Sequence, residues 1–261
     1  MSLSISRLMG LLMLCLLLGF AFLLPLIDRG DPLEQDLLRI LHAPSSGSLL
    51  GFDHLGRDML PRLSAALRLS LGLAALCVMS AMMAGVVTGV LSAVYGGWLD
   101  RLISLLGDMC LALPGLLLVL LLAAIAPDSP GMLWLGISLV LWVEFFRVTR
   151  ATLRPIVHAP GMQASRLLGF SAFYRFRRHL WPALAPILMT LILFSFSSAI
   201  MAVSALGFIS VGVRPPTPEL GLMMTELLPF AWEAPWLLLQ PVTALFLLLI
   251  SLNLLMNKER K

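Results

Sequence analysis

Residues 69–94 read LSLGLAALCVMSAMMAGVVTGVLSAV, a run of 26 residues that contains no charged side chain. A helix needs about 20 mostly apolar residues to cross the hydrocarbon core of a bilayer. A helix on the surface of a soluble protein would instead carry a polar face at helical spacing. This stretch therefore predicts a membrane-spanning helix, and the rest of the chain has to be interpreted around it.

The composition of the whole chain agrees with that prediction. Of the 261 residues, 59% are hydrophobic and 12% are charged, and the mean hydropathy is +0.97. An average soluble domain is about 45–50% apolar and about 25% charged. A water-exposed surface needs more charge than this chain supplies, so lipid must solvate part of it. We expect an all-α integral membrane protein.

Six apolar stretches are long enough, or nearly long enough, to span a bilayer. Their approximate limits are 8–27, 69–94, 102–126, 132–146, 187–211 and 236–256. We expect one transmembrane domain over 1–261, with a first span at about 8–27, an outer loop at about 28–68 and core spans within 69–256. The fourth stretch is the shortest and contains Glu144 near its inner end, and Pro114 lies inside the third.

The distribution of basic residues predicts the orientation, because cytoplasmic loops retain an excess of Lys and Arg. With the N-terminus inside, twelve of the 18 basic residues are cytoplasmic, and both termini lie on that side. The inner set is Arg7, Arg101, Arg147, Arg150, Arg154, Arg166, Arg175, Arg177, Arg178, Lys258, Arg260 and Lys261. The outer set is Arg29, Arg39, Arg57, Arg62, Arg68 and Arg214. The inner loop at about 148–186 contains no Asp or Glu.

Motifs for catalysis are missing from the sequence. There is no H-E-x-x-H, G-x-S-x-G or paired-cysteine motif, so we predict neither catalytic residues nor a metal site. No G-x-x-x-x-G-K-[ST] loop is present, so any ATP would bind another chain. The net charge of +4 is not gathered into a nucleic-acid-binding pattern, and we expect no nucleic-acid partner.

Two acidic residues lie within predicted spans, where an ionisable group is a functional candidate by default. Asp108 belongs to the third span and Glu144 to the inner end of the fourth. They could form the proton or cation relay of a secondary transporter. Arg101 lies two turns from Asp108 and Arg147 lies three residues after Glu144, so structural ion pairing is the favoured interpretation.

The inner loop carries two short helical patterns. Residues 161–169 (GMQASRLLG) predict a short helix that ends at Gly169, because glycine readily adopts the left-handed cap conformation. Phe173, Phe176 and Leu180 then recur at helical spacing until Pro182, which we expect to end the segment. Either an interfacial helix held by anionic lipid or a docking element for a cytoplasmic protein would fit these residues.

This loop resembles the EAA loop of permease subunits from binding-protein-dependent ABC importers. Gln163, Ala164 and Ser165 stand at the Glu-Ala-Ala positions, Gly169 at the glycine, and His179 and Pro182 at the later His and Pro. Two of the three leading positions depart from the family pattern, and Gln163 lacks the charge for any salt bridge that a glutamate would make there.

Other segments resemble the second permease of the dipeptide, oligopeptide and nickel group. Residues 50–58 (LGFDHLGRD) are similar to the group's L-G-T-D-x-x-G-R-D signature. Residues 95–100 (YGGWLD), Asp108, Pro114, Trp142, Arg147 and Arg150 continue the similarity, and 215–218 (PPTP), Gly221, 234–236 (APW), Pro241 and 253–255 (NLL) extend it. Together these segments run from about Leu50 to Leu255.

The resemblance implies a type I importer membrane domain in a bacterial inner membrane. Such a subunit would pair with a homologous permease, two ATPase subunits would dock on the inner loops, and an extracytoplasmic binding protein would deliver substrate. Gln163, Ala164, Ser165, Arg166, Gly169, His179 and Pro182 would form the ATPase-coupling loop, while ATP and Mg would bind the partner ATPases. The residues of the loop resemble those of nickel or metal-chelate permeases more than those of long-oligopeptide permeases, so the resemblance implies nickel or metal chelates or short peptides as the substrate. An ion-coupled secondary transporter, and a membrane scaffold or enzyme, are the alternatives.

Overall fold

The computed structural model describes residues 5–27, 30–45, 48–126 and 129–256, and almost every element in them is helical. The long helices are α1 (Ile5–Ile27), α2 (Met59–Tyr95), α3 (Gly97–Leu111), α4 (Gly115–Ile125), α5 (Pro130–Val157), α8 (Trp181–Phe208) and α10 (Pro235–Met256). The short ones are η1 (Leu37–Arg39), α6 (Pro160–Leu167), α7 (Ala172–Arg175), η2 (Phe176–Leu180), α9 (Leu220–Leu227) and η3 (Leu228–Phe230). Two isolated bridges, Ser45 with Ser48 and Phe52 with Asp58, are the β-type pairings within the described ranges.

Five helices of the described chain are long and apolar enough to cross a membrane, and the bent pair α3 and α4, at the predicted third span, makes a sixth if it counts as one span. The two halves of that pair meet at 85°. The prediction of one continuous third span is therefore wrong in its geometry. Pro114 explains the break, because it has no N–H to donate and keeps Leu113 out of the helical region; it stands at the start of α4 instead.

Three other spans extend beyond their apolar stretches. α2 begins at Met59, where the Asp58 side chain accepts a hydrogen bond from the Leu60 N–H, so Arg62 and Arg68 belong to the helix rather than to the outer loop. α5 continues through three arginines to Val157, well past the predicted end at Phe146. One continuous helical stretch runs from Ala172 to Phe208. The apolar runs marked the apolar parts of these helices and missed their polar extensions.

The core forms where α2 crosses α5. Gly89 faces α5 so closely that an added Cβ would lie 2.6 Å from the Thr149 Cβ and 2.9 Å from the Phe146 carbonyl oxygen. Small residues allow such approach between spanning helices, where van der Waals packing has to supply the stability. α8 packs against α2, α5 and α10, and α1 packs along α10, where Gly10 lies against Ser251 and Leu254.

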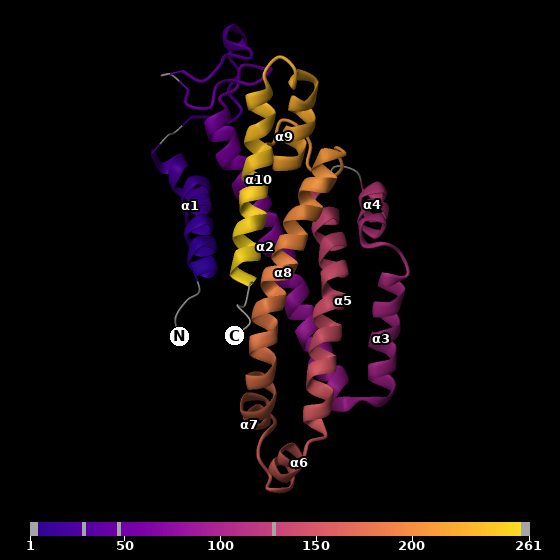
Figure 1. Cartoon of the computed structure of the whole chain (residues 1–261). Helices are drawn as coiled ribbons and strands as arrows, with labels where there is room; N and C mark the ends of the chain where they lie inside the picture. Colours follow the sequence, from indigo (N-terminus) through magenta and orange to yellow (C-terminus); the bar gives the residue numbers. More distant parts are fainter. Residues whose placement is uncertain (1–4, 28–29, 46–47, 127–128, 257–261) are drawn as a thin grey trace.

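The polar segments gather at two opposite ends of the bundle (Figure 1). The segment before α2 lies with α9 at one end, and α6 and α7 project at the other. The N-terminal end of α1 and the C-terminal end of α10 both point toward the end of the bundle at which α6 projects (Figure 1). Four basic residues of the orientation argument, namely Arg29, Lys258, Arg260 and Lys261, lie outside the described residues.

Candidate functional site

The short helix of the projecting end is α6, and it stops at Gly169. Gly169 has φ +76°, and the Phe170 N–H donates to the Ser165 carbonyl oxygen at 3.1 Å. This backbone pattern satisfies carbonyl groups at the helix end that would otherwise lack partners. The prediction of a short helix ended by a left-handed glycine is confirmed. A side chain at this position would be strained even though the space around it is open.

Side chains from separate parts of the predicted coupling loop hold α6 against the following helix. Ser165 Oγ lies 2.9 Å from His179 Nε2, which joins α6 to η2. Gln163 Nε2 donates to the His158 carbonyl oxygen at 3.2 Å, and Met162 is buried. Ser165 and His179 are thus a contacting pair, which their separation of fourteen residues did not reveal.

Pro182 does not end the amphipathic segment, so that expectation is wrong. The chain runs from α7 through a π-helical turn, η2, directly into α8. In this turn the Trp181 N–H donates to the Phe176 carbonyl oxygen, one residue farther back than in an α-helix. Such a turn suits a proline, because the widened backbone accommodates the missing donor at Pro182.

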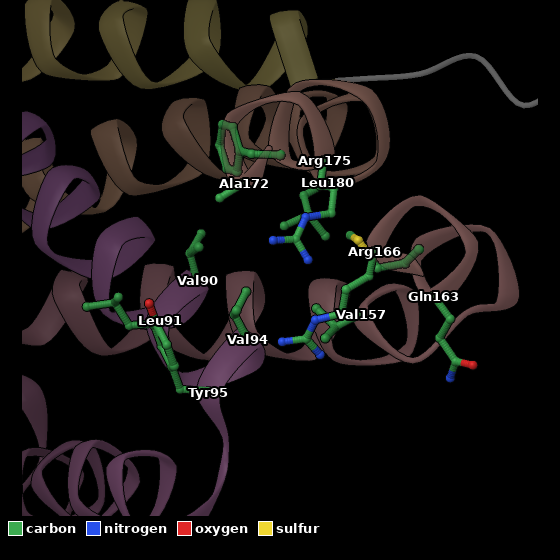
Figure 2. A pocket seen from close by; sticks show the side chains of 12 residues that line it. Val90, Leu91, Val94, Tyr95, Val157, Gln163, Arg166, Ala172, Arg175 and Leu180 are labelled. Carbon is green, nitrogen blue, oxygen red and sulfur yellow. The ribbon is translucent and has the colours of Figure 1, made fainter. Parts of the chain in front are cut away.

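The outward and inward sides of α6 differ in their surroundings. Outward, Leu167 is 90% exposed and Leu168 is 75% exposed, with Phe173 close by in sequence at 73%. Inward, α6 closes a cavity of about 350 Å³ against the ends of α2 and α5, and Arg166 lines it (Figure 2). Unpartnered large apolar side chains on a projecting helix are typical of a protein-binding surface.

The two intramembrane acids behave differently from the predicted ion pairing. Asp108 Oδ1 lies 2.6 Å from Arg147 Nη2, rather than pairing with Arg101, and both side chains are more than half exposed. Glu144 makes no ion pair with Arg147, and its buried Oε2 has no hydrogen-bond partner among the described residues. Within the described residues, no hydrogen bond or ion pair joins Asp108 to Glu144.

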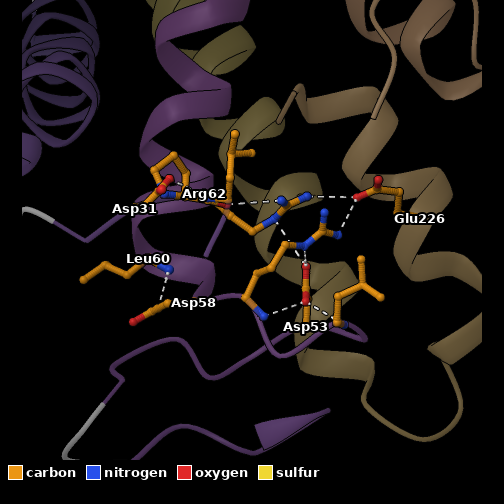
Figure 3. A network of polar contacts seen from close by, with 10 residues as sticks. Asp31, Asp53, Asp58, Leu60, Arg62 and Glu226 are labelled. Carbon is orange, nitrogen blue, oxygen red and sulfur yellow. Dashed lines mark hydrogen bonds and ion pairs between the residues drawn. The ribbon is translucent and has the colours of Figure 1, made fainter. Parts of the chain in front are cut away.

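A buried charge network occupies the opposite end of the molecule (Figure 3). Arg57 Nε lies 2.6 Å from Asp53 Oδ2, and Arg62 Nη2 lies 2.9 Å from Glu226 Oε2. Arg57 also reaches Glu226, at 3.2 Å, and both arginines are 1% exposed. Two cations and two carboxylates balance in charge, so the network ties the segment before α2 to α9 without an uncompensated ion.

A second contact joins the same two segments. His54 stacks on Phe230 of η3, with the ring centroids 5.2 Å apart. Burial lowers the pKa of His54 below 6.5, despite the opposing field of Asp53. Neutral imidazole therefore fits this contact better than the charged form does.

Sequence reasoning named several of these residues without assigning them a role. The i, i+4 spacing of Asp53 and Arg57 is a local signal, but Glu226 is 169 residues away from Arg57. At the α6 end, Arg150 Nη2 of α5 lies 2.7 Å from Asp100 Oδ2 of α3, and Ser92 also donates to Asp100. These long-range pairs have no signature in a single sequence.

Comparison with known proteins places the chain in a family. Residues 85–257, more than half of the chain, match the binding-protein-dependent transport system inner membrane component. The chain is 31% identical over 257 residues to the dipeptide transport system permease protein DppC of Haemophilus influenzae, covering 96% of this chain and 87% of that protein. It is 36% identical over 253 residues to DppC of Escherichia coli K12, covering 94% and 84%. The di/tripeptide permease DppC of Pseudomonas aeruginosa is 34% identical over 255 residues, covering 94% and 83%.

These matches agree with the architecture, in which apolar helices fill the bundle and a short helix projects between α5 and α8. The resemblance of the chain to permeases of binding-protein-dependent ABC importers is confirmed at the level of the family. The chain belongs to the inner membrane components of binding-protein-dependent transport systems, as a multi-pass ABC importer permease with a type I membrane domain.

Proposed function

We propose that this permease imports short peptides, driven by ATP that separate subunits hydrolyse. The relatives named above are dipeptide and di/tripeptide permeases, each matched over more than nine tenths of this chain. Among the two substrate classes expected from the sequence, that pattern favours short peptides and gives no support to nickel or metal chelates. The chain itself acts as a transport subunit and not as an enzyme, with ATP and Mg bound by the partner ATPases.

The observation that carries this proposal is the projecting α6 and its rigid support. α5 and the stretch Ala172–Phe208 flank α6, and they are 28 and 37 residues long. At 1.5 Å per residue these helices measure about 42 Å and 55 Å, more than the roughly 30 Å of hydrocarbon. Each helix is therefore too long to lie wholly within the hydrocarbon core, and we assign the excess to the ends next to α6, as stiff supports.

The exposed Leu167 and Leu168 give a partner protein an apolar surface to hold on α6. A movement of that partner would pass through the Ser165–His179 contact and the backbone into α5 and α8. Gln163, Ala164, Arg166, Gly169 and Pro182 complete the loop that we assign to coupling. ATP-driven closure of two ATPase subunits would in this way rearrange the spans, so that the translocation path opens alternately to the two sides of the membrane.

The remaining partners follow from the same assignment. A homologous permease would complete the translocation path as a heterodimer, and an extracytoplasmic binding protein would deliver peptide at the end that holds Arg57 and Glu226. We place both termini and α6 in the cytoplasm, with the arginine-rich inner segments, and membrane lipid surrounds the apolar helices.

Reconstituted uptake tests the proposal. The complete importer in proteoliposomes, with its binding protein, should accumulate labelled dipeptide only when ATP is inside and the ATPase subunits are intact. ATPase subunits with an inactivated phosphate-binding lysine are the matched control. Uptake that continues with them and collapses when a protonophore dissipates the proton gradient would instead establish a secondary transporter. Competition by nickel, and not by unlabelled dipeptide, would overturn the peptide assignment.

A further inference from the structure

The cavity under α6 combines an apolar wall with two cationic side chains. Val90, Leu91 and Val94 of α2 form the wall, together with the neighbouring Tyr95. Arg166 of α6 and Arg175 of α7 line the same space of about 350 Å³. Figure 2 shows both guanidinium groups on the side of the loop that faces α2, while the Gln163 amide points away.

Neither arginine finds an anion within the described parts of the chain. No ion pair joins Arg166 or Arg175 to a carboxylate there, and the inner loop at 148–186 contains no acidic residue. Nearby, Asp100 is already paired with Arg150. The Arg175 Nε is buried without any hydrogen-bond partner in the described structure. A buried donor without a partner costs free energy, so this group is suited to an external acceptor.

The exposed side chains next to the cavity place it at the depth of lipid headgroups. Tyr95 is 73% exposed and Trp98 is 74% exposed, as is typical of the aromatic residues that mark a membrane interface. One turn farther along α3, a series of exposed leucines begins, at Leu102, Leu105 and Leu106. Hydrocarbon contact therefore starts just beyond Trp98, and Tyr95 lies at the boundary.

We propose that this cavity binds the headgroup phosphate of an anionic phospholipid. The phosphate would lie between Arg166 and Arg175, since guanidinium groups donate paired hydrogen bonds to phosphate oxygens. The first carbons of the acyl chains would pack on Val90, Leu91 and Val94. The lipid thus braces the inner side of α6, while Leu167 and Leu168 stay on its outer side.

An acidic side chain of a docked protein is the competing source of negative charge. The position of the cavity favours lipid, because its wall belongs to a spanning helix and its rim carries the interfacial Tyr95. A protein that approaches α6 from the cytoplasm meets the exposed leucines first. The proposal does not depend on ATPase coupling or on peptide as the substrate, because lipid binding can be measured without either.

Retention of lipid by the purified full-length permease tests the site. The protein is equilibrated in nanodiscs of phosphatidylethanolamine with phosphatidylglycerol, extracted into detergent, and the bound lipids are counted by native mass spectrometry. We expect retained phosphatidylglycerol, and an affinity reduced about fivefold by Arg175→Gln, since one interfacial cation contributes a factor of this size. Arg177→Gln is the matched control, because Arg177 is exposed and does not line the cavity.

A second variant keeps the charge and fills the space. Val94→Trp should also reduce retention, and it decides the test if Arg175→Gln does not yield folded protein. Equal losses in Arg175→Gln and Arg177→Gln would overturn the proposal, because general surface charge would then explain retention. Displacement of the lipid by inorganic phosphate would show a free-phosphate site, and loss of the lipid when ATPase subunits bind would assign the arginines to a protein partner; either result overturns it.

Discussion

Gly169 determines how the chain leaves α6, because its φ of +76° is costly for any residue with a Cβ. A valine there would add roughly 1–2 kcal/mol of backbone strain. We expect Gly169→Val to lower ATP-dependent uptake by about 5- to 30-fold while ATP hydrolysis continues, since the loop would populate its coupling conformation less often.

The measurement is uptake per ATP hydrolysed in proteoliposomes. Gly169→Asn is the matched control, because asparagine tolerates the left-handed region and should keep most of the coupling. If valine and asparagine give the same ratio, the backbone conformation of Gly169 does not matter for coupling.

Glu226 contributes to stability, because it neutralises two arginines that are 1% exposed. Glu226→Gln leaves Arg57 and Arg62 with Asp53 as their remaining carboxylate, and an uncompensated buried charge costs about 3–5 kcal/mol. We expect a clear fall in the midpoint of thermal unfolding of the detergent-solubilised protein.

Asp36→Asn provides the comparison for this prediction. Asp36 pairs with Arg39 where the side chains are 42% and 53% exposed, and such pairs contribute about 0–1 kcal/mol. Equal shifts in the unfolding midpoint for the two variants would mean that Glu226 does not balance a buried charge.

At the scale of elements, the sequence predicted which segments are apolar enough to cross the membrane. It did not predict the bends and lengths of the helices that those segments form. Apolar length predicted every spanning region, and Gly169 marked the end of α6. The 85° bend at Pro114 was not predicted, because proline within a span is compatible with either a kink or a break. The extension of α5 past Arg147 was missed, since polar residues of a projecting helix look like those of a loop.

The candidate site shows the same division between local and long-range information. The residues of the loop, from Gln163 to His179, could be identified from motif spacing within one stretch of chain. The Ser165–His179 contact, the cavity at Arg175 and the pairing of Asp108 with Arg147 depend on how helices pack. A single sequence carries no direct signal for such contacts.

The crossing of α2 and α5 offers a test at this scale. An added Cβ at Gly89 would lie 2.6 Å from the Thr149 Cβ, so Gly89→Ala should destabilise the protein by about 1–3 kcal/mol through overpacking. Gly72, in the same helix, has nothing within 4 Å of an added Cβ. Gly72→Ala should leave the thermal unfolding midpoint unchanged or raise it slightly, because alanine favours helix. A stable Gly89→Ala protein would show that this close approach is not required.

For the whole molecule, the separation of its two polar ends is the feature on which function depends. The network of Arg57, Arg62, Asp53 and Glu226 joins the segment before α2 to α9, and the Ser165–His179 contact holds α6. Figure 1 shows α9 and α6 at opposite ends of the bundle. The spans between them are long continuous helices, which can carry displacement from one end to the other. The proposed coupling role requires that the α6 end lie on the side where ATP is available.

Accessibility of single cysteines tests that orientation. Leu167 on α6 is 90% exposed, and Trp232, which follows η3 at the other end, is 97% exposed. In a background where Cys15, Cys77 and Cys110 are replaced by alanine, a membrane-impermeant maleimide should label Trp232→Cys in right-side-out vesicles. Leu167→Cys should react only in inverted vesicles, because the excess of arginine keeps its segment inside. The reverse pattern would place α6 outside, where no cytoplasmic ATPase could reach it, and would refute the coupling assignment.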